Sequence, residues 1–88
     1  MLTADGFDEA ILGVIRCKGR EDVACYDYGR CVAILIKRDK LSAEDACEHM
    51  EFNVVDAFVG DGTPAFLMQV PSDEDPVEFV RLWGEELN

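Results

Sequence analysis

The sequence has few basic residues and no long apolar run. Eight Lys and Arg stand against 19 Asp and Glu among 88 residues, which gives a formal net charge of -11. Such a surface repels phosphates, so we expect no direct nucleic-acid partner and no anionic membrane. No stretch approaches the roughly 18 apolar residues of a membrane-spanning helix, and residues 1–9 lack the basic start and apolar core of a secretory signal. We therefore expect a cytoplasmic protein.

Residues suited to catalysis or metal binding are also scarce. His49 is the single histidine. On a helix it would point about 200° away from Cys47, so the two residues cannot form a local catalytic pair. The four cysteines lack the C-x-x-C spacing of a zinc site, and in a reducing cytosol they stay as thiols. The sequence thus predicts no enzymatic activity, no metal and no cofactor.

The apolar residues that are present suffice for one small core. They make up 49% of the chain, and 88 residues allow a single domain over residues 1–88. Apolar spacings of three and four residues predict helices, and short apolar runs predict strands. We expect an α+β domain of about four helices on a minimal two-stranded sheet, in the order helix, strand, helix, helix, strand, helix. The expected elements are at 6–17, 23–26, 28–38, 43–59, 65–70 and 76–87.

Short polar side chains support the expected helix starts. Asp27, Ser42 and Asp75 each precede an apolar periodic stretch and can accept a hydrogen bond from its first turn. Gly60 ends the third helix. The strand at 65–70 does not alternate, so we expect it to be buried on nearly both faces. Two strands alone are marginally stable, so the helices cover them or a second chain extends the sheet as a homodimer.

The excess negative charge belongs to the second half of the sequence. Residues 1–40 hold seven acids and seven bases, whereas residues 41–88 hold twelve acids and one base. We expect a bipolar molecule with a mixed-charge end and an acidic end, unless folding intermixes the two halves.

One face of the helix expected at 43–59 concentrates carboxylates. Glu44, Glu48 and Glu51 are spaced four and three residues apart, so they line up over about 10 Å of helix. Three carboxylates over about 10 Å give a density of about one per 3.5 Å, comparable to the roughly 3.4 Å per phosphate of one DNA strand. The stripe is either an ordinary solvated helix face or an imitation of a phosphate backbone.

Two apolar residues, Phe52 and Val55, project onto this acidic side instead of into the core. Either the helix breaks near Asn53 and both side chains turn inward, or they form an apolar patch that contacts another chain. An apolar anchor with an acidic rim is typical of an interface with a basic partner. The predicted partner-binding residues are Glu44, Glu48, Glu51, Phe52, Val55 and Asp56.

Three short motifs follow one another within residues 6–68. They are Tyr26-Asp27-Tyr28, Glu51-Phe52-Asn53-Val54 and Thr63-Pro64-Ala65-Phe66. With this pattern the chain resembles a family of short, functionally uncharacterised proteins carried by tailed bacteriophages and prophages. The resemblance implies a phage origin and action in the bacterial cytoplasm. It implies no catalytic or ligand-binding residue.

The function that the sequence predicts is binding rather than catalysis. We expect a small acidic module that docks on a basic surface of a host protein, as a DNA mimic or an anti-defence inhibitor. The alternative is a structural accessory protein, a homodimer that buries Phe52 and the sheet edge without inhibitory activity.

Overall fold

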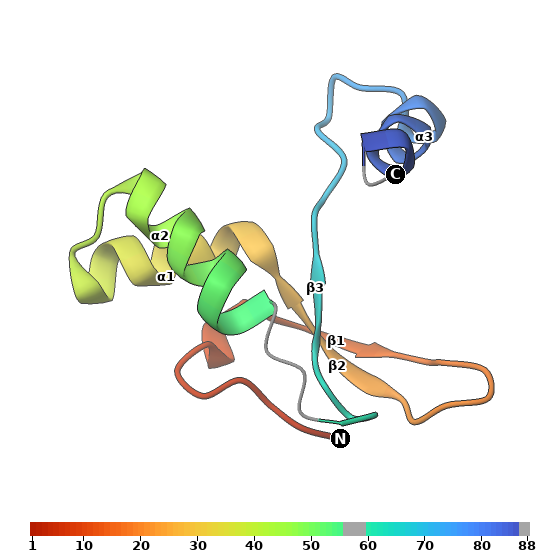
Figure 1. Cartoon of the computed structure of the whole chain (residues 1–88), viewed down its shortest axis with the longest axis horizontal. Coiled ribbons are helices and arrows are strands. Elements are labelled where there is room, and N and C mark those ends of the chain that lie inside the picture. Colours follow the sequence, from red (N-terminus) through yellow and green to blue (C-terminus); the bar gives the residue numbers. More distant parts are fainter. Residues whose placement is uncertain (56–59, 87–88) are drawn as a thin grey trace.

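The computed structural model describes residues 1–55 and 60–86 and has an α+β fold (Figure 1). The sequence predicted this class. Within the described residues, however, the sheet has three strands and there are three α-helices, instead of the expected two strands and four helices. The elements are a 3-10 turn η1 (Asp8–Ala10), β1 (Ile11–Ile15), β2 (Val23–Asp27), α1 (Tyr28–Asp39), α2 (Ala43–His49), a π-helix η2 (Met50–Val55), β3 (Ala65–Leu67) and α3 (Pro76–Glu86).

The helix predicted at 6–17 is wrong, because η1 and β1 occupy that stretch. β1 pairs antiparallel with β2, and Ile11 lies opposite Tyr26. Val14 lies opposite Ala24, and the register shifts between the two pairs. A bulge adds one residue to a strand, so residues three apart lie on the same face of the sheet. Ile11 and Val14 therefore repeat at a helical spacing within a strand.

β2 is the central strand of the sheet. β1 pairs with it on one edge, and β3 runs parallel to it on the other. All five residues of β2 are buried, whereas four of the five in β1 are exposed. The strand predicted at 65–70 is shorter in the structure and is not buried on both faces, since Leu67 is 43% exposed. The reason is its place at the edge, from which the chain leads away from the sheet (Figure 1).

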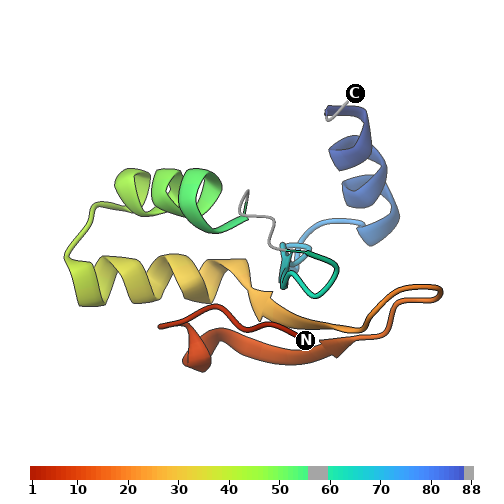
Figure 2. The same ribbon diagram turned by 60° about the horizontal axis from the view of Figure 1, so that its bottom comes forward.

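α1 and α2 begin where the sequence predicted. Asp27 Oδ1 accepts a hydrogen bond from the backbone N–H of Arg30 at 3.0 Å, and Ser42 Oγ accepts one from that of Asp45 at 3.1 Å. Lys40 ends α1 in the left-handed conformation, with φ of 57°. The two helices then lie side by side as a layer next to the sheet (Figure 2).

The core lies between this helical layer and the central strand. Its largest fully buried side chains are those of Tyr26, Leu35, Met50 and Cys31. The Tyr26 ring stacks on Phe66 of β3 at 5.6 Å, and its hydroxyl accepts a hydrogen bond from the Ala4 N–H at 2.8 Å. One side chain of β2 thus ties β3 and the N-terminal segment to the core.

The helix predicted at 43–59 changes its geometry part-way. α2 ends at His49, and η2 continues as a π-helix over Met50–Val55. Residues 56–59, and with them the expected approach to Gly60, lie outside the described residues.

α3 forms as predicted but stands apart from the rest of the chain. Asp75 Oδ1 accepts a hydrogen bond from the Val77 N–H at 3.0 Å, so the predicted cap is confirmed. An extended segment after β3 carries α3 away from α1, α2 and the sheet (Figure 1, Figure 2). None of the described helices combines the length and apolar character needed to cross a membrane.

Candidate partner-binding surface

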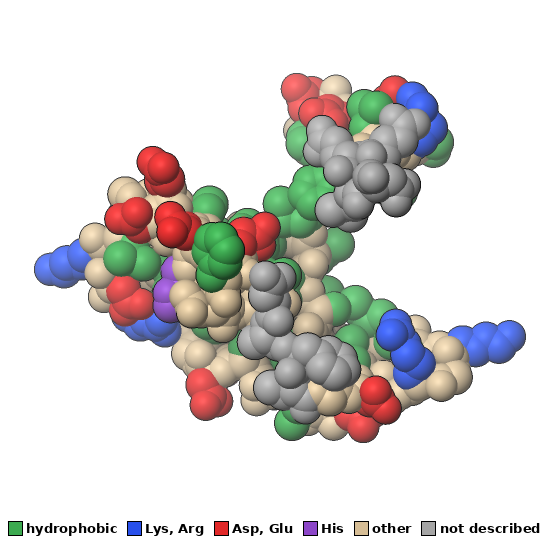
Figure 3. Space-filling model, viewed as in Figure 1, with side chains coloured by type: hydrophobic (Ala, Val, Ile, Leu, Met, Phe, Trp, Pro, Cys, Tyr) green, Lys and Arg blue, Asp and Glu red, His purple; other side chains and the backbone are tan. Residues whose placement is uncertain are grey.

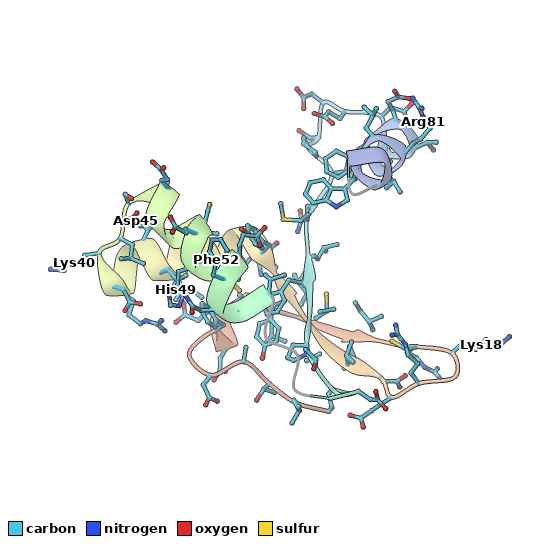
Figure 4. All side chains as sticks on the ribbon, in the orientation of Figure 1. Lys18, Lys40, Asp45, His49, Phe52 and Arg81 are labelled. Carbon is cyan, nitrogen blue, oxygen red and sulfur yellow. The ribbon has the colours of Figure 1, made fainter. Side chains whose placement is uncertain are left out.

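The predicted binding residues that the structure describes, all except Asp56, lie exposed on α2 and η2. We call the surface formed by Glu44, Asp45, Glu48, Glu51 and Phe52 the acidic face. All five residues are exposed. In Figure 3, carboxylates lie on both sides of a hydrophobic patch at the place where Figure 4 labels Phe52.

Phe52 is the one aromatic residue of the acidic face, and 71% of its surface is accessible. Val55 is 37% exposed, so the alternative in which both side chains turn inward is wrong. The helix does depart from α geometry, but from Met50 onward rather than at Asn53. A π turn bonds residue i to i+5, so each residue advances less around the axis than in an α-helix. Short π segments occur frequently at functional sites.

Phe52 forms one wall of a shallow hollow of about 460 Å³. Asp45, Glu48 and His49 line it as well, and the remaining lining residues are Leu41 and Asn53. An aromatic ring beside two carboxylates suits a long cationic side chain. The aliphatic stem can lie on the ring while the charged end reaches a carboxylate.

The three glutamates of the predicted stripe do not share one hollow. Glu48 lines the hollow, whereas Glu51 lies near Tyr28. Burial raises the pKa of the Tyr28 hydroxyl, and the Glu51 carboxylate raises it further. Glu44 is exposed on α2 without lining the hollow, and Asp56 lies outside the described residues. The carboxylates of the acidic face thus do not form one continuous stripe, because Phe52 lies among them.

His49 contributes to the electrostatics at the end of α1. The pKa of Asp39 is lowered, mainly because it accepts hydrogen bonds from the Arg38 guanidinium, the nearer at 3.1 Å, and less strongly because of His49. His49 is half-buried and lines the hollow. Its imidazole thus lies near both the hollow and Asp39.

The two buried thiols, Cys25 and Cys31, are less acidic than an ordinary cysteine. Burial, followed by the charge of Asp27, raises the pKa of Cys31 to about 11, and the same two causes raise the pKa of Cys25. Both side chains are buried free thiols, and Cys47 is an exposed one. In the part of the chain that the structure describes, no three His, Cys, Asp or Glu residues cluster as a metal site would require.

Sequence reasoning missed part of the hollow. Leu41, Asp45 and His49 line the hollow but are not among the predicted partner-binding residues. Asp45 and Glu48 are three residues apart, and His49 follows four after Asp45, so the helical spacing carried a signal for their proximity. Leu41 precedes the helix, and only the turn between α1 and α2 brings it to the hollow.

No family model, curated protein or solved structure matches this chain.

Proposed function

We propose that this chain is a non-enzymatic, phage-encoded binding module of the bacterial cytoplasm whose acidic face docks on a basic surface of a host protein. The observation that carries the proposal is the exposure of Phe52, at 71%, among exposed carboxylates. Covering an exposed aromatic side chain with a partner removes apolar surface from water, which stabilises the complex. The surrounding carboxylates select a partner that is positively charged.

The hollow indicates how such a partner would be held. An arginine side chain of the host protein can lay its stem on Phe52 and present its guanidinium to Glu48 or Asp45. Arginine binds carboxylates through two parallel hydrogen bonds, which adds directionality to the contact. The proposed contact is thus both apolar and charged.

The Phe52 side chain bears on the DNA-mimic version of the proposal. The exposed carboxylates of Glu44 and Glu48 carry the negative charge that phosphate mimicry needs, but a nucleic-acid backbone carries no apolar group like Phe52 beside its phosphates. Phe52 supports a surface that adds an apolar contact to charge complementarity. An inhibitor of a nucleic-acid-binding host protein remains the favoured role within this proposal.

Capture from a bacterial lysate tests the proposal with a matched pair of variants. The triple variant E44K/E48K/E51K reverses three charges on the acidic face. The control D5K/E9K/D61K makes the same change in net charge at three exposed positions elsewhere. We expect the triple variant to capture at least about tenfold less host protein than the wild type, and the control to capture as much as the wild type. Equal retention by both variants overturns the proposal.

Two further measurements separate the contributions to that contact. Raising the salt concentration to about 0.5 M weakens a charge-based complex, because the screening length falls to a few ångströms. Phe52→Ala lowers retention at low salt as well, where screening is weak.

The alternative is a structural homodimer that buries Phe52 against a second copy. In that case Phe52→Ala weakens self-association, and no host protein depends on the carboxylates of the acidic face. Sedimentation equilibrium of the wild type and of F52A decides between the two functions.

A further inference from the structure

α3 presents an apolar face that the described part of its own chain leaves uncovered. Val77, Val80 and Trp83 are 76, 65 and 43% exposed. Together with Phe79, which stacks on Trp83 at 6.0 Å, they fall within about 160° of the helix circumference at 3.6 residues per turn. The helix is thus amphipathic in the way that a packed helix is.

The length of α3 makes this exposure unfavourable. The helix has 11 residues. Helices shorter than about 12–15 residues are marginal in water unless an amphipathic face is packed. Since α3 stands clear of α1, α2 and the sheet in both views (Figure 1, Figure 2), a surface outside its own body is needed to stabilise it.

β1 presents the matching uncovered surface. Its apolar side chains are exposed on both sides of the sheet, with Val14 at 56% opposite Ala24 and Ile15 at 39% opposite Val23. Ile11 is also exposed, at 42%. β1 is in addition an edge strand, so its outer backbone groups pair with no other described strand.

The charges next to the two apolar surfaces are complementary. Residues 71–86 hold six acids and one base, whereas the turn between β1 and β2 holds three bases, Arg16, Lys18 and Arg20, and two acids, Glu21 and Asp22, and so keeps one excess positive charge. The Arg16 side chain is 92% exposed, and Lys18 marks the tip of the hairpin in Figure 4. The other bases of the first half lie on α1 or just after it, where the only exposed large apolar residue in α1 is Ile36. The acidic α3 segment therefore fits the hairpin better than it fits α1.

We infer that α3 of one copy packs on β1 of a second copy, with its acidic residues beside the basic turn. β3 lies on the sheet edge opposite to β1, and the segment after it leads outward, as an exchanged arm does (Figure 1). In a two-fold symmetric dimer each copy donates its α3 and receives that of its partner on β1. The apolar face of α3 and that of β1 are therefore covered in both copies. A stable dimer buries about 800 Å² per partner. That area is about one eighth of the 6501 Å² of this chain.

Sedimentation equilibrium of the full chain tests this dimer. We expect a mass of twice 9.8 kDa for the wild type. Val80→Glu places a charge in each of the two α3–β1 contacts of the dimer. We expect it to raise the dissociation constant at least about 100-fold. The matched control is Leu82→Glu, because Leu82 is 45% exposed but lies about 160° around the helix from Val80. We expect the control to stay within about threefold of the wild type. A monomeric wild type, or equal effects of both variants, overturns the inference.

A spin label identifies which surfaces meet. Cys17 and Cys47 are changed to Ser, Leu82→Cys receives the label, and the buried Cys25 and Cys31 remain unlabelled because burial raises their pKa values. Unlabelled chain enriched in ¹⁵N is then mixed with labelled chain at natural abundance. We expect broadening of the β1 amides in the ¹⁵N copy.

Other patterns of broadening contradict the arrangement. Broadening near η2 instead of β1 means that the copies meet through another surface. A second sample, in which the ¹⁵N-enriched chain itself carries the label, tests the remaining arrangement. Broadening of the β1 amides in that sample but not in the mixed sample means that α3 packs on its own hairpin. Because the acidic face takes no part in this dimer, F52A leaves the mass unchanged, and failure of the host-binding proposal leaves the dimer untouched.

Discussion

α1 and α3 are similar helices in very different surroundings. They have 12 and 11 residues, and each begins after an aspartate whose side chain accepts a hydrogen bond from the first turn. Along α1, Cys31 and Leu35 are completely buried, whereas Val77 and Val80 of α3 are among the most exposed apolar residues described. The comparison shows that an amphipathic pattern fixes which side of a helix is apolar, but not which surface covers it.

A single buried side chain connects the two regions. Asp27 is 9% exposed. Its Oδ1 atom caps α1, and its Oδ2 atom accepts a hydrogen bond from Gln69 Nε2 at 2.7 Å. Gln69 belongs to the segment that leads from β3 to α3. The same carboxylate thus starts the packed helix and anchors the outgoing arm.

The largest expected effect is a contrast between two leucines. Leu35→Ala removes a fully buried side chain and lowers the free energy of unfolding by about 3 kcal/mol. Leu82→Ala, at a position that is 45% exposed, changes it by about 0.5 kcal/mol or less. Urea unfolding of both variants measures the difference. Similar losses at the two positions would mean that α3 packs on the body in solution, which would end the contrast between the helices.

A smaller effect concerns the connection between the regions. Asp27→Ala removes a cap and a partner of Gln69, so we expect a loss of about 2 kcal/mol in the free energy of unfolding. Gln69→Ala is expected to lose about 1 kcal/mol. The double variant then loses about 1 kcal/mol less than the two single losses added together, because the shared hydrogen bond is counted once. If the loss of the double variant equals the sum of the two single losses, the Asp27–Gln69 hydrogen bond does not anchor the segment between β3 and α3.

The smallest effect is a dependence of the packed region on alkaline pH. Burial holds the folded-state pKa of Cys31 at about 11, above its ordinary value of 9.0. The unfolded chain therefore loses this proton first as the pH rises, so the stabilisation is complete below pH 9 and is lost on approach to pH 11. Between pH 8 and pH 10 the free energy of unfolding falls by about 1 kcal/mol.

Two variants check the assignment of this pH dependence. Cys31→Ala removes the larger part of the fall and leaves the part that the raised pKa of Cys25 contributes, whereas Cys47→Ala, which changes an exposed thiol, keeps the larger part. A fall that is undiminished in C31A would assign the titration to another group.

Sequence reasoning succeeded where the decisive interaction is local. The starts of α1, α2 and α3 follow from Asp27, Ser42 and Asp75, because a cap joins residues two or three apart. It failed at β1, because the bulge that places Ile11 and Val14 on one face exists only when β2 is beside it. The site was predicted in part by the same logic. An ideal α-helix correctly placed Phe52 on the acidic side of the expected helix. It did not account for the π-helix at Met50–Val55, which changes the angle between Glu48 and Glu51 about the helix axis.

The sequence by itself determined the charge excess, the α+β class and the positions of three helix starts. These properties depend on composition or on neighbours within one turn. The tertiary structure alone decided that a third strand completes the sheet, that Phe52 remains in water and that α3 stands clear of the body. Each of these depends on contacts between segments far apart in the chain. No local pattern states whether a second surface is present to cover an apolar face.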